Sequence, residues 1–179
     1  MKSRHPMKHC QMKHCQQILI GSVTLLTLSC LTSSVTADVR SKDEASIRSE
    51  IQKMDQAADN RNVDGYIAFT HPDFVNIDKN GKETNHGKEE RKQKFSQLFA
   101  NATQVRQQTT VTHIIFSKQG ATADKVSNNF MILTRNGQTI ELKGSGTYRD
   151  FWVKSTGVWL QKRSRTIAEN TTINGQPVP

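Results

Sequence analysis

Residues 139–153 read TIELKGSGTYRDFWV and residues 158–170 read VWLQKRSRTIAEN, and these two segments decide the fold class. Both are rich in β-branched and aromatic residues, and Thr156-Gly157 between them is a turn signal. The pattern predicts a hairpin of two long β-strands. Gly144 and Gly146 lie inside the first of these strands, where we expect a sharp bend or a bulge.

The same composition extends upstream of this hairpin. Residues 109–117 and 122–134 are also rich in β-branched and aromatic residues. Turn signals separate the segments at Gln119-Gly120 and at Asn136-Gly137. Four long strands with short connections predict an antiparallel meander.

Residues 38–103 have helical periodicity instead. Ser41 and Glu44 are typical of a capping box, and apolar residues then recur at spacings of three and four. The pattern predicts, in order, a helix from about 41 to 60, a short helix near 66–69, a strand over 73–78 and a helix from about 87 to 102. Together these elements predict an α+β fold, in which a curved antiparallel sheet of four to five strands wraps around N-terminal helices and encloses a pocket.

The first 37 residues predict a signal peptide. A basic start precedes the uncharged stretch 18–37, and small residues stand before a cut after Ala37. The many Ser and Thr residues argue against a stable membrane span, so we expect an exported protein, periplasmic or secreted. A lipid anchor on Cys30 is the minor alternative. The pentapeptide MKHCQ occurs twice in succession, at residues 7–16, which leaves Met1, Met7 and Met12 open as the start.

Removing this leader changes the composition. All three Cys precede residue 38, so the expected mature chain has no disulfide, no thiolate nucleophile and no Cys-bound metal. The net charge falls from +9 to +5, since residues 38–179 hold 21 basic and 16 acidic side chains. Ten basic but only four acidic residues lie in 104–179, which is the predicted sheet. We expect no nucleic acid partner, no metal and no cofactor, because no matching motif is present.

Three motifs carry a resemblance to a known family. Residues 62–66 read NVDGY and precede PDFV at 72–75, a Gly-Lys-Glu follows Gly81 at 87–89, and residues 146–159 read GTYRDFWVKSTGVW. Their order resembles the nuclear transport factor 2-like (cystatin-like) superfamily, and its SnoaL-like and ketosteroid-isomerase-like branch in particular. The resemblance covers residues 44–170. It leaves 171–179 as an expected flexible tail, and it implies a domain over 38–170 that could form a homodimer.

The resemblance also implies site residues. Counting from Asp64-Gly65 places the general base of the isomerases on Asp78, although a turn role for this residue is the competing interpretation. The oxyanion-hole tyrosine falls on Met54, which cannot donate a hydrogen bond. Asp150 is the candidate for the second oxyanion donor.

Strand alternation adds candidates of its own. Tyr148, Asp150 and Trp152 share one strand face, which either lines the hollow or faces solvent. Arg163 and Arg165 share a face, together with Trp159 by the same parity, and could hold an anion or pair with Asp150. The candidates for catalysis are Asp78, Tyr148 and Asp150, and those for ligand binding are Tyr66, Trp152, Arg163 and Arg165.

The fold does not fix the function. The leading hypothesis is an exported domain that binds a small, partly apolar molecule, which could be anionic, between sheet and helices. One alternative is an isomerase, dehydratase or cyclase with Asp78 as base, so enzymatic activity stays open. Another is a periplasmic protein-interaction module whose hollow is filled by its own side chains.

Overall fold

A computed structural model describes residues 38–135 and 137–178. The expected leader, its cut after Ala37 and the alternative lipid site at Cys30 lie outside the described residues. Of the described residues, 38–42 belong to one unit, in which Lys42 pairs with Asp38, and those from Asp43 onward belong to a second, which contains the sheet. Within the described ranges, no helix has the length and apolar character needed to cross a membrane.

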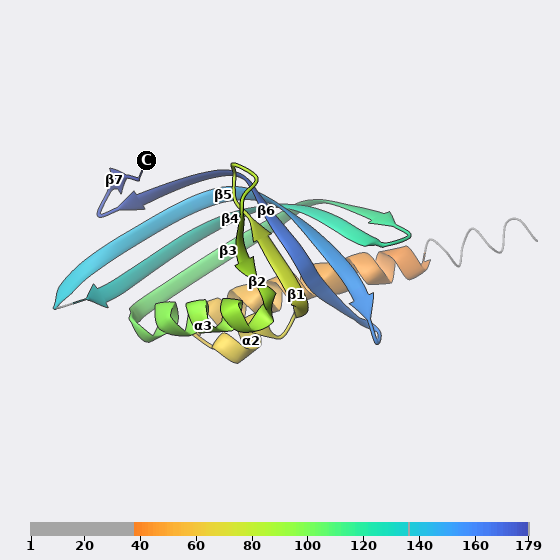
Figure 1. Cartoon of the computed structure of the whole chain (residues 1–179), viewed down its shortest axis with the longest axis horizontal. Coiled ribbons are helices and arrows are strands. Elements are labelled where there is room, and N and C mark those ends of the chain that lie inside the picture. The colour runs from red at the N-terminus through yellow and green to blue at the C-terminus, as the bar shows by residue number, and fades with distance from the viewer. Residues whose placement is uncertain (1–37, 136, 179) are drawn as a thin grey trace, which may run out of the picture. The chain divides into compact units, whose positions relative to one another are not determined.

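One mixed sheet forms most of the second unit, in the order β2-β1-β6-β5-β4-β3 (Figure 1). The long antiparallel meander consists of β3 (Ala102–Ser117), β4 (Gly120–Arg135), β5 (Gln138–Ser155) and β6 (Val158–Ile173). This confirms the predicted meander, because Gly120, Gly137 and Gly157 of the three turn signals each lie at or next to the end of a strand.

Three further strands complete the sheet. β1 (Thr70–Ile77) runs parallel to β6, and β2 (Glu83–His86) pairs with the outer side of β1. A two-residue strand, β7 (Gln176–Pro177), pairs with β6 within the segment expected to be a flexible tail. Within residues 38–135 and 137–178 the sheet therefore has seven strands rather than four to five, and it is mixed rather than wholly antiparallel. β2 and β7 are too short to show a period-two pattern in the sequence.

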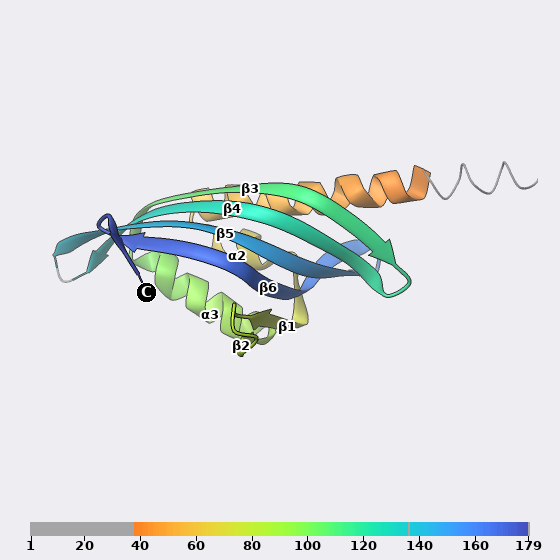
Figure 2. The same ribbon diagram turned by 90° about the horizontal axis from the view of Figure 1, so that it is seen from above.

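In the second unit, the helical residues lie along the concave side of the sheet (Figures 1 and 2). Helical residues run from 38 to 59, so Ser41 lies inside a helix and is not its N-cap. The short α2 (Val63–Ile67) is capped by Asn62, whose Oδ1 accepts from Gly65 N at 3.0 Å. α3 (Gly87–Ala100) follows β2, and its glycine start has φ +86°.

Two irregularities in the β5–β6 pairing decide which side chains of β6 face inward. The register shifts between Thr147 and Tyr148 and again between Phe151 and Trp152, and each shift leaves one residue of β6 unpaired. Across the second shift the buried positions change from Trp159 and Gln161 to Ser164 and Thr166. The expectation that Trp159 shares a face with Arg163 and Arg165 is therefore wrong, because an extra residue reverses the alternation.

The first helix also covers the free edge of the sheet. The carboxylates of Asp59 and Asp55 each accept a backbone N–H of β3, from Gln107 and Thr109, both at 2.7 Å. Arg48 donates to the carbonyl of Val111 at 2.9 Å. Three helix side chains thus satisfy backbone groups that an edge strand otherwise leaves open to another strand.

Candidate functional site

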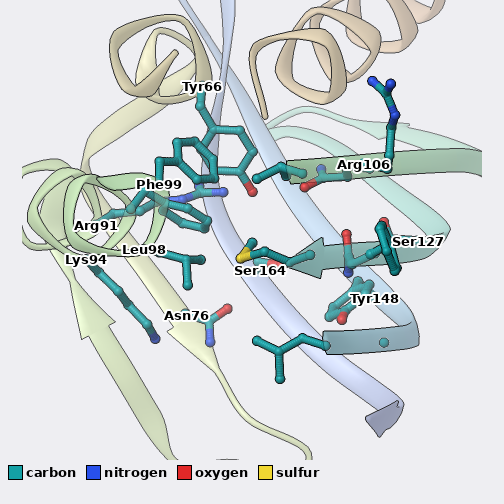
Figure 3. A pocket seen from close by; sticks show the side chains of 18 of the residues that line it. Tyr66, Asn76, Arg91, Lys94, Leu98, Phe99, Arg106, Ser127, Tyr148 and Ser164 are labelled. Atoms are coloured by element: carbon teal, nitrogen blue, oxygen red, sulfur yellow. The ribbon is translucent and has the colours of Figure 1, made fainter. Parts of the chain in front are cut away.

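A hollow of about 370 Å³ opens between α2 and α3 on one side and the inner face of the sheet on the other (Figure 3). This volume is in the usual range for small-molecule sites. Its wall combines an aromatic end on the helices with polar side chains on β4, β5 and β6.

The aromatic end is formed by Tyr66 of α2 and by Phe95 and Phe99 of α3. The ring centroid of Phe95 lies 4.3 Å from that of Tyr66 and 5.6 Å from that of Phe99, and Tyr66 and Phe99 meet edge to face at 5.9 Å. Such pairs add about 0.5–1.5 kcal/mol each to the burial of their area. The cluster therefore makes a firm apolar wall.

Arg91 of α3 lies against this wall and is only 6% exposed. Its Nη1 donates to Gln161 Oε1 at 2.6 Å and to Thr70 Oγ1 at 3.2 Å. The guanidinium carbon lies 4.3 Å from the ring centroid of Phe74 and 5.4 Å from that of Tyr66. No acidic side chain of the described ranges forms an ion pair with Arg91. A buried cation is thus held only by neutral acceptors and aromatic faces.

A second buried charge, on Asp150 of β5, has a charged partner. Lys125 Nζ lies 2.6 Å from Asp150 Oδ2, and Ser164 donates to Oδ1 at 2.7 Å. Lys125 thus supplies the counter-charge of Asp150. Asp150 is fully buried beneath the wall, and Lys125 and Ser164 line it.

Among the residues that the structure describes, the lining includes five basic side chains and no acidic one: Arg91, Lys94, Arg106, Lys125 and Lys143. Three of them have acidic partners nearby, since Arg106 pairs with Asp59, Lys125 with Asp150 and Lys143 with Glu141. Figure 3 shows the guanidinium of Arg106 turned away from the hollow. The cations of the wall without an acidic partner in the described part of the chain are Arg91, which is buried, and Lys94, which is exposed.

Tyr148 stands on the sheet side of the hollow (Figure 3). Burial raises the pKa of its hydroxyl, and the nearby negative charges of Glu169 and Asp150 raise it further. The hydroxyl therefore stays protonated at neutral pH and can donate a hydrogen bond. A side chain on Gly146 would collide with it, because a Cβ there would lie 2.5 Å from the Tyr148 hydroxyl oxygen.

The predicted site residues are dispersed by the fold. Tyr66 and Tyr148 line the hollow, whereas Trp152 is packed in the core and does not line it. Arg163 and Arg165 are exposed and do not belong to the lining, and Asp150 pairs with Lys125 instead of either arginine.

Asp78 lies in the turn between β1 and β2. Its Oδ1 accepts from the backbone N–H groups of Asn80 and Lys82, both at 2.9 Å, and the residue is not part of the lining. Its carboxylate is thus occupied by the turn, which was the competing interpretation of this position.

Arg91 and Gln161 did not stand out in the sequence. Arg91 belongs to the polar segment that opens α3, yet it precedes Phe95 by four residues and Phe99 by eight, which places all three on one helix face. That spacing was the available signal. For Gln161 the available signal was its spacing of two from Trp159, because the irregularity in β6 begins only beyond Gln161.

Solved structures support this fold. A protein from Novosphingobium aromaticivorans, provisionally named a scytalone dehydratase, is 18% identical and superposes with a TM-score of 0.62 over 74% of this chain and 89% of its own. A hexachlorocyclohexane dehydrochlorinase (LinA) Type2 gives 15% identity and a TM-score of 0.58 over 78% and 91% of the two chains. An NTF-2 like protein of unknown function from Shewanella oneidensis is 15% identical and superposes with a TM-score of 0.53 over 69% of this chain and 97% of its own.

The superpositions show the fold alone, whereas comparison by sequence identifies the family. The search of curated proteins found no match. The family model of the SnoaL-like domain matches residues 39–165, which is most of the chain. The resemblance in the sequence and the arrangement of sheet and helices point to the same family, and the chain belongs to the SnoaL-like domain family.

Proposed function

We propose that this domain binds a small molecule with an acidic group and an apolar body in the hollow between sheet and helices. The observation that carries the proposal is the lining, which has an aromatic end, no acidic side chain among the described residues, and two cations, Arg91 and Lys94, without an acidic partner there. A positive wall of this kind favours anions, and the aromatic cluster favours an apolar body beside the charge. The hollow is not filled by side chains of the domain, which speaks against the interaction module as the competing hypothesis.

The enzymatic alternative has less support. Two structural neighbours are named as a dehydratase and a dehydrochlorinase, so chemistry in such a hollow has precedent. Removing a proton from carbon needs a base within reach of the substrate. The described residues of the lining provide neither a carboxylate nor an imidazole, and the carboxylate of Asp78 serves a turn. Binding without turnover is therefore the function that we propose.

Export is part of this proposal and rests on the sequence of the leader alone. A homodimer is likewise an expectation from the family resemblance. Neither affects the binding test below, which can be made with residues 38–179.

The test uses 8-anilinonaphthalene-1-sulfonate, an anionic aromatic dye, as the probe. We expect the dye to bind the unmodified domain and to bind at least about tenfold more weakly to Leu98→Trp, because the larger ring fills the hollow that Leu98 lines. Gln97→Trp is the matched control, since Gln97 is exposed and lies outside the lining. Equal dye binding in the two variants, or none in the unmodified domain, would contradict the proposal.

A further inference from the structure

We infer that Arg91 anchors a planar carboxylate, and that the ligand is therefore an aromatic carboxylic acid whose ring lies against Tyr66, Phe95 and Phe99. This inference rests on the proposed function and names the class of ligand for the same hollow. It concerns which of the five cations holds the acid group, and in what orientation.

The first step is the charge of Arg91. Burying a charged group without a counter-charge is costly, so buried arginines are usually paired. Asp150 follows this rule through Lys125, but Arg91 is 6% exposed and has only Thr70 and Gln161 as hydrogen-bond partners within the described chain. A ligand carboxylate would supply the missing negative charge.

The second step is the direction of the remaining donors. Both hydrogen bonds of Arg91 to described residues leave from Nη1, to Gln161 and Thr70, whereas Nε and Nη2 form none with these residues. Nε and Nη2 together make the fork that matches the two oxygens of a carboxylate. The oxygen of Gln161 is used by Arg91, so the amide of Gln161 presents its NH₂ group as a further donor on the same side of the hollow.

The third step is the shape of the surroundings. Phe74 stacks on the guanidinium at 4.3 Å and fixes its plane, and the ring centroids of Tyr66 and Phe95 lie 5.4 and 5.8 Å from it. Figure 3 shows Arg91 reaching from α3 toward the ring of Tyr66. A ligand whose acid group meets this fork therefore has its body beside aromatic faces, where a planar ring makes offset or edge contacts.

The other basic residues of the lining suit this role less well. Arg106, Lys125 and Lys143 have acidic partners, and Lys94 is exposed, where water screens its charge. A lysine is also a point charge that does not distinguish a planar carboxylate from other anions. The alternative role for Arg91 is structural, since its two hydrogen bonds join α3 to β1 and β6.

The experiment measures binding of three probes by calorimetry: naphthalene-2-carboxylate, naphthalene-2-sulfonate and the neutral naphthalene-2-methanol. The unmodified domain is expected to bind the carboxylate most tightly and the alcohol least. Arg91→Lys keeps the charge but loses the fork. We expect its affinity for the carboxylate to fall at least about tenfold, and its affinity for the alcohol to stay within about twofold of that of the unmodified domain. Lys92→Met is a control on the same helix, because Lys92 pairs with Asp64 outside the lining.

A second variant does not depend on replacing the arginine. Gln161→Glu places a carboxylate at the atom that now lies 2.6 Å from Nη1, so the protein supplies its own counter-charge. We expect this variant to fold at least as stably as the unmodified domain and to lose carboxylate binding at least about tenfold, with the alcohol unaffected. Gln97→Glu adds the same charge at an exposed site on α3 and is expected to change affinity less than about twofold.

The outcomes separate this inference from the proposed function. If the dye binds and responds to Leu98→Trp, but carboxylate affinity survives both Arg91→Lys and Gln161→Glu, the hollow binds anions without Arg91 and the inference is overturned. Equal losses for carboxylate and alcohol in both variants would assign Arg91 a structural role only. If neither the dye nor any naphthyl probe binds the unmodified domain, the proposed function itself fails.

Discussion

Two buried charges, one on the wall of the hollow and one beneath it, are stabilised in different ways. Asp150 has a lysine and a serine as partners, whereas Arg91 has two neutral acceptors and three aromatic faces. A charge that the protein itself balances contributes to the folded structure, and a charge left without a counter-ion is available to a ligand. This contrast makes Arg91, rather than Lys125, the site of recognition.

The pair of Lys125 and Asp150 gives the first prediction. Lys125→Met is expected to lower the free energy of unfolding by about 3–5 kcal/mol, because Asp150 would keep a buried charge with only Ser164 as its partner. The double variant Lys125→Met with Asp150→Leu is expected to recover most of this loss, since neither charge remains. Urea unfolding of the single and double variants measures both effects, and a single variant as stable as the double one would contradict the argument.

Asp43 gives a prediction about acid. Burial raises the pKa of its carboxyl, but hydrogen bonds from Lys154 and Trp159 and the charge of Lys154 outweigh burial and hold it below its ordinary value. A lowered pKa in the folded state gives stability that is complete above the unfolded value of about 4 and is lost as the pH falls through the folded value.

Asp43→Asn is therefore expected to lower stability at neutral pH by up to about 1 kcal/mol and to differ little from the unmodified domain at the acid end. Urea unfolding at several pH values measures the difference. Asp73→Asn is the control, because the side chain of Asp73 is 79% exposed. If the difference in the free energy of unfolding between Asp43→Asn and the unmodified domain grows toward acid pH, the pKa of Asp43 is not lowered by folding and the prediction is wrong.

Among the elements, turn chemistry was the most informative part of the sequence. Gly120, Gly137 and Gly157 all have positive φ, and each lies at a turn that the sequence marked. β3 begins at Ala102, seven residues before the predicted start at 109, because residues 103–108 are mostly polar and exposed and do not show a strand pattern. They form an edge strand that helix side chains cover, and no local period reveals such cover.

This cover gives a prediction for Asp55. Its carboxylate accepts the backbone N–H of Thr109 at 2.7 Å, the Thr109 hydroxyl at 2.8 Å and the Gln107 side-chain amide at 2.7 Å. Asp55→Ala is expected to cost about 1–3 kcal/mol, because these donors lose their acceptor where water reaches them only in part. Hydrogen exchange of the Thr109 amide should also become faster.

The neighbouring substitution Gln56→Ala serves as the control. Gln56 is exposed, and its backbone carbonyl rather than its side chain accepts from Asn60, so the stability of this variant should change by less than about 0.5 kcal/mol. Unchanged exchange at Thr109 in Asp55→Ala would mean that the helix does not protect this edge.

At the scale of the whole molecule, the sequence predicted the hollow but only part of its lining. Tyr66 and Tyr148 were named in advance, because one belongs to a family motif and the other to a recognisable strand face. The sequence does not predict the hydrogen bond between Arg91 and Gln161, since it joins residues 70 positions apart. Such a pair depends on how α3 crosses the sheet, which is not visible in local spacing.

The distribution of charge over the molecule leads to the last prediction. Residues 104–179 hold ten basic and four acidic side chains, and no acidic residue of the described chain lines the hollow that these strands largely form. A positive field of this kind speeds the approach of an anion, and salt weakens it because the Debye length falls to about 10 Å at 0.1 M. We expect the association rate of 8-anilinonaphthalene-1-sulfonate to fall about threefold to tenfold between about 0.02 M and about 0.2 M salt.

The dissociation rate should change less than about twofold over the same range, because contacts inside the hollow are shielded from added ions. Stopped-flow fluorescence separates the two rates. Naphthalene-2-methanol, which has no charge, is the control in a competition format and should show no salt dependence of its association. If the charged and neutral probes respond to salt equally, the positive wall does not attract the ligand from a distance, and the acid group is recognised only after entry.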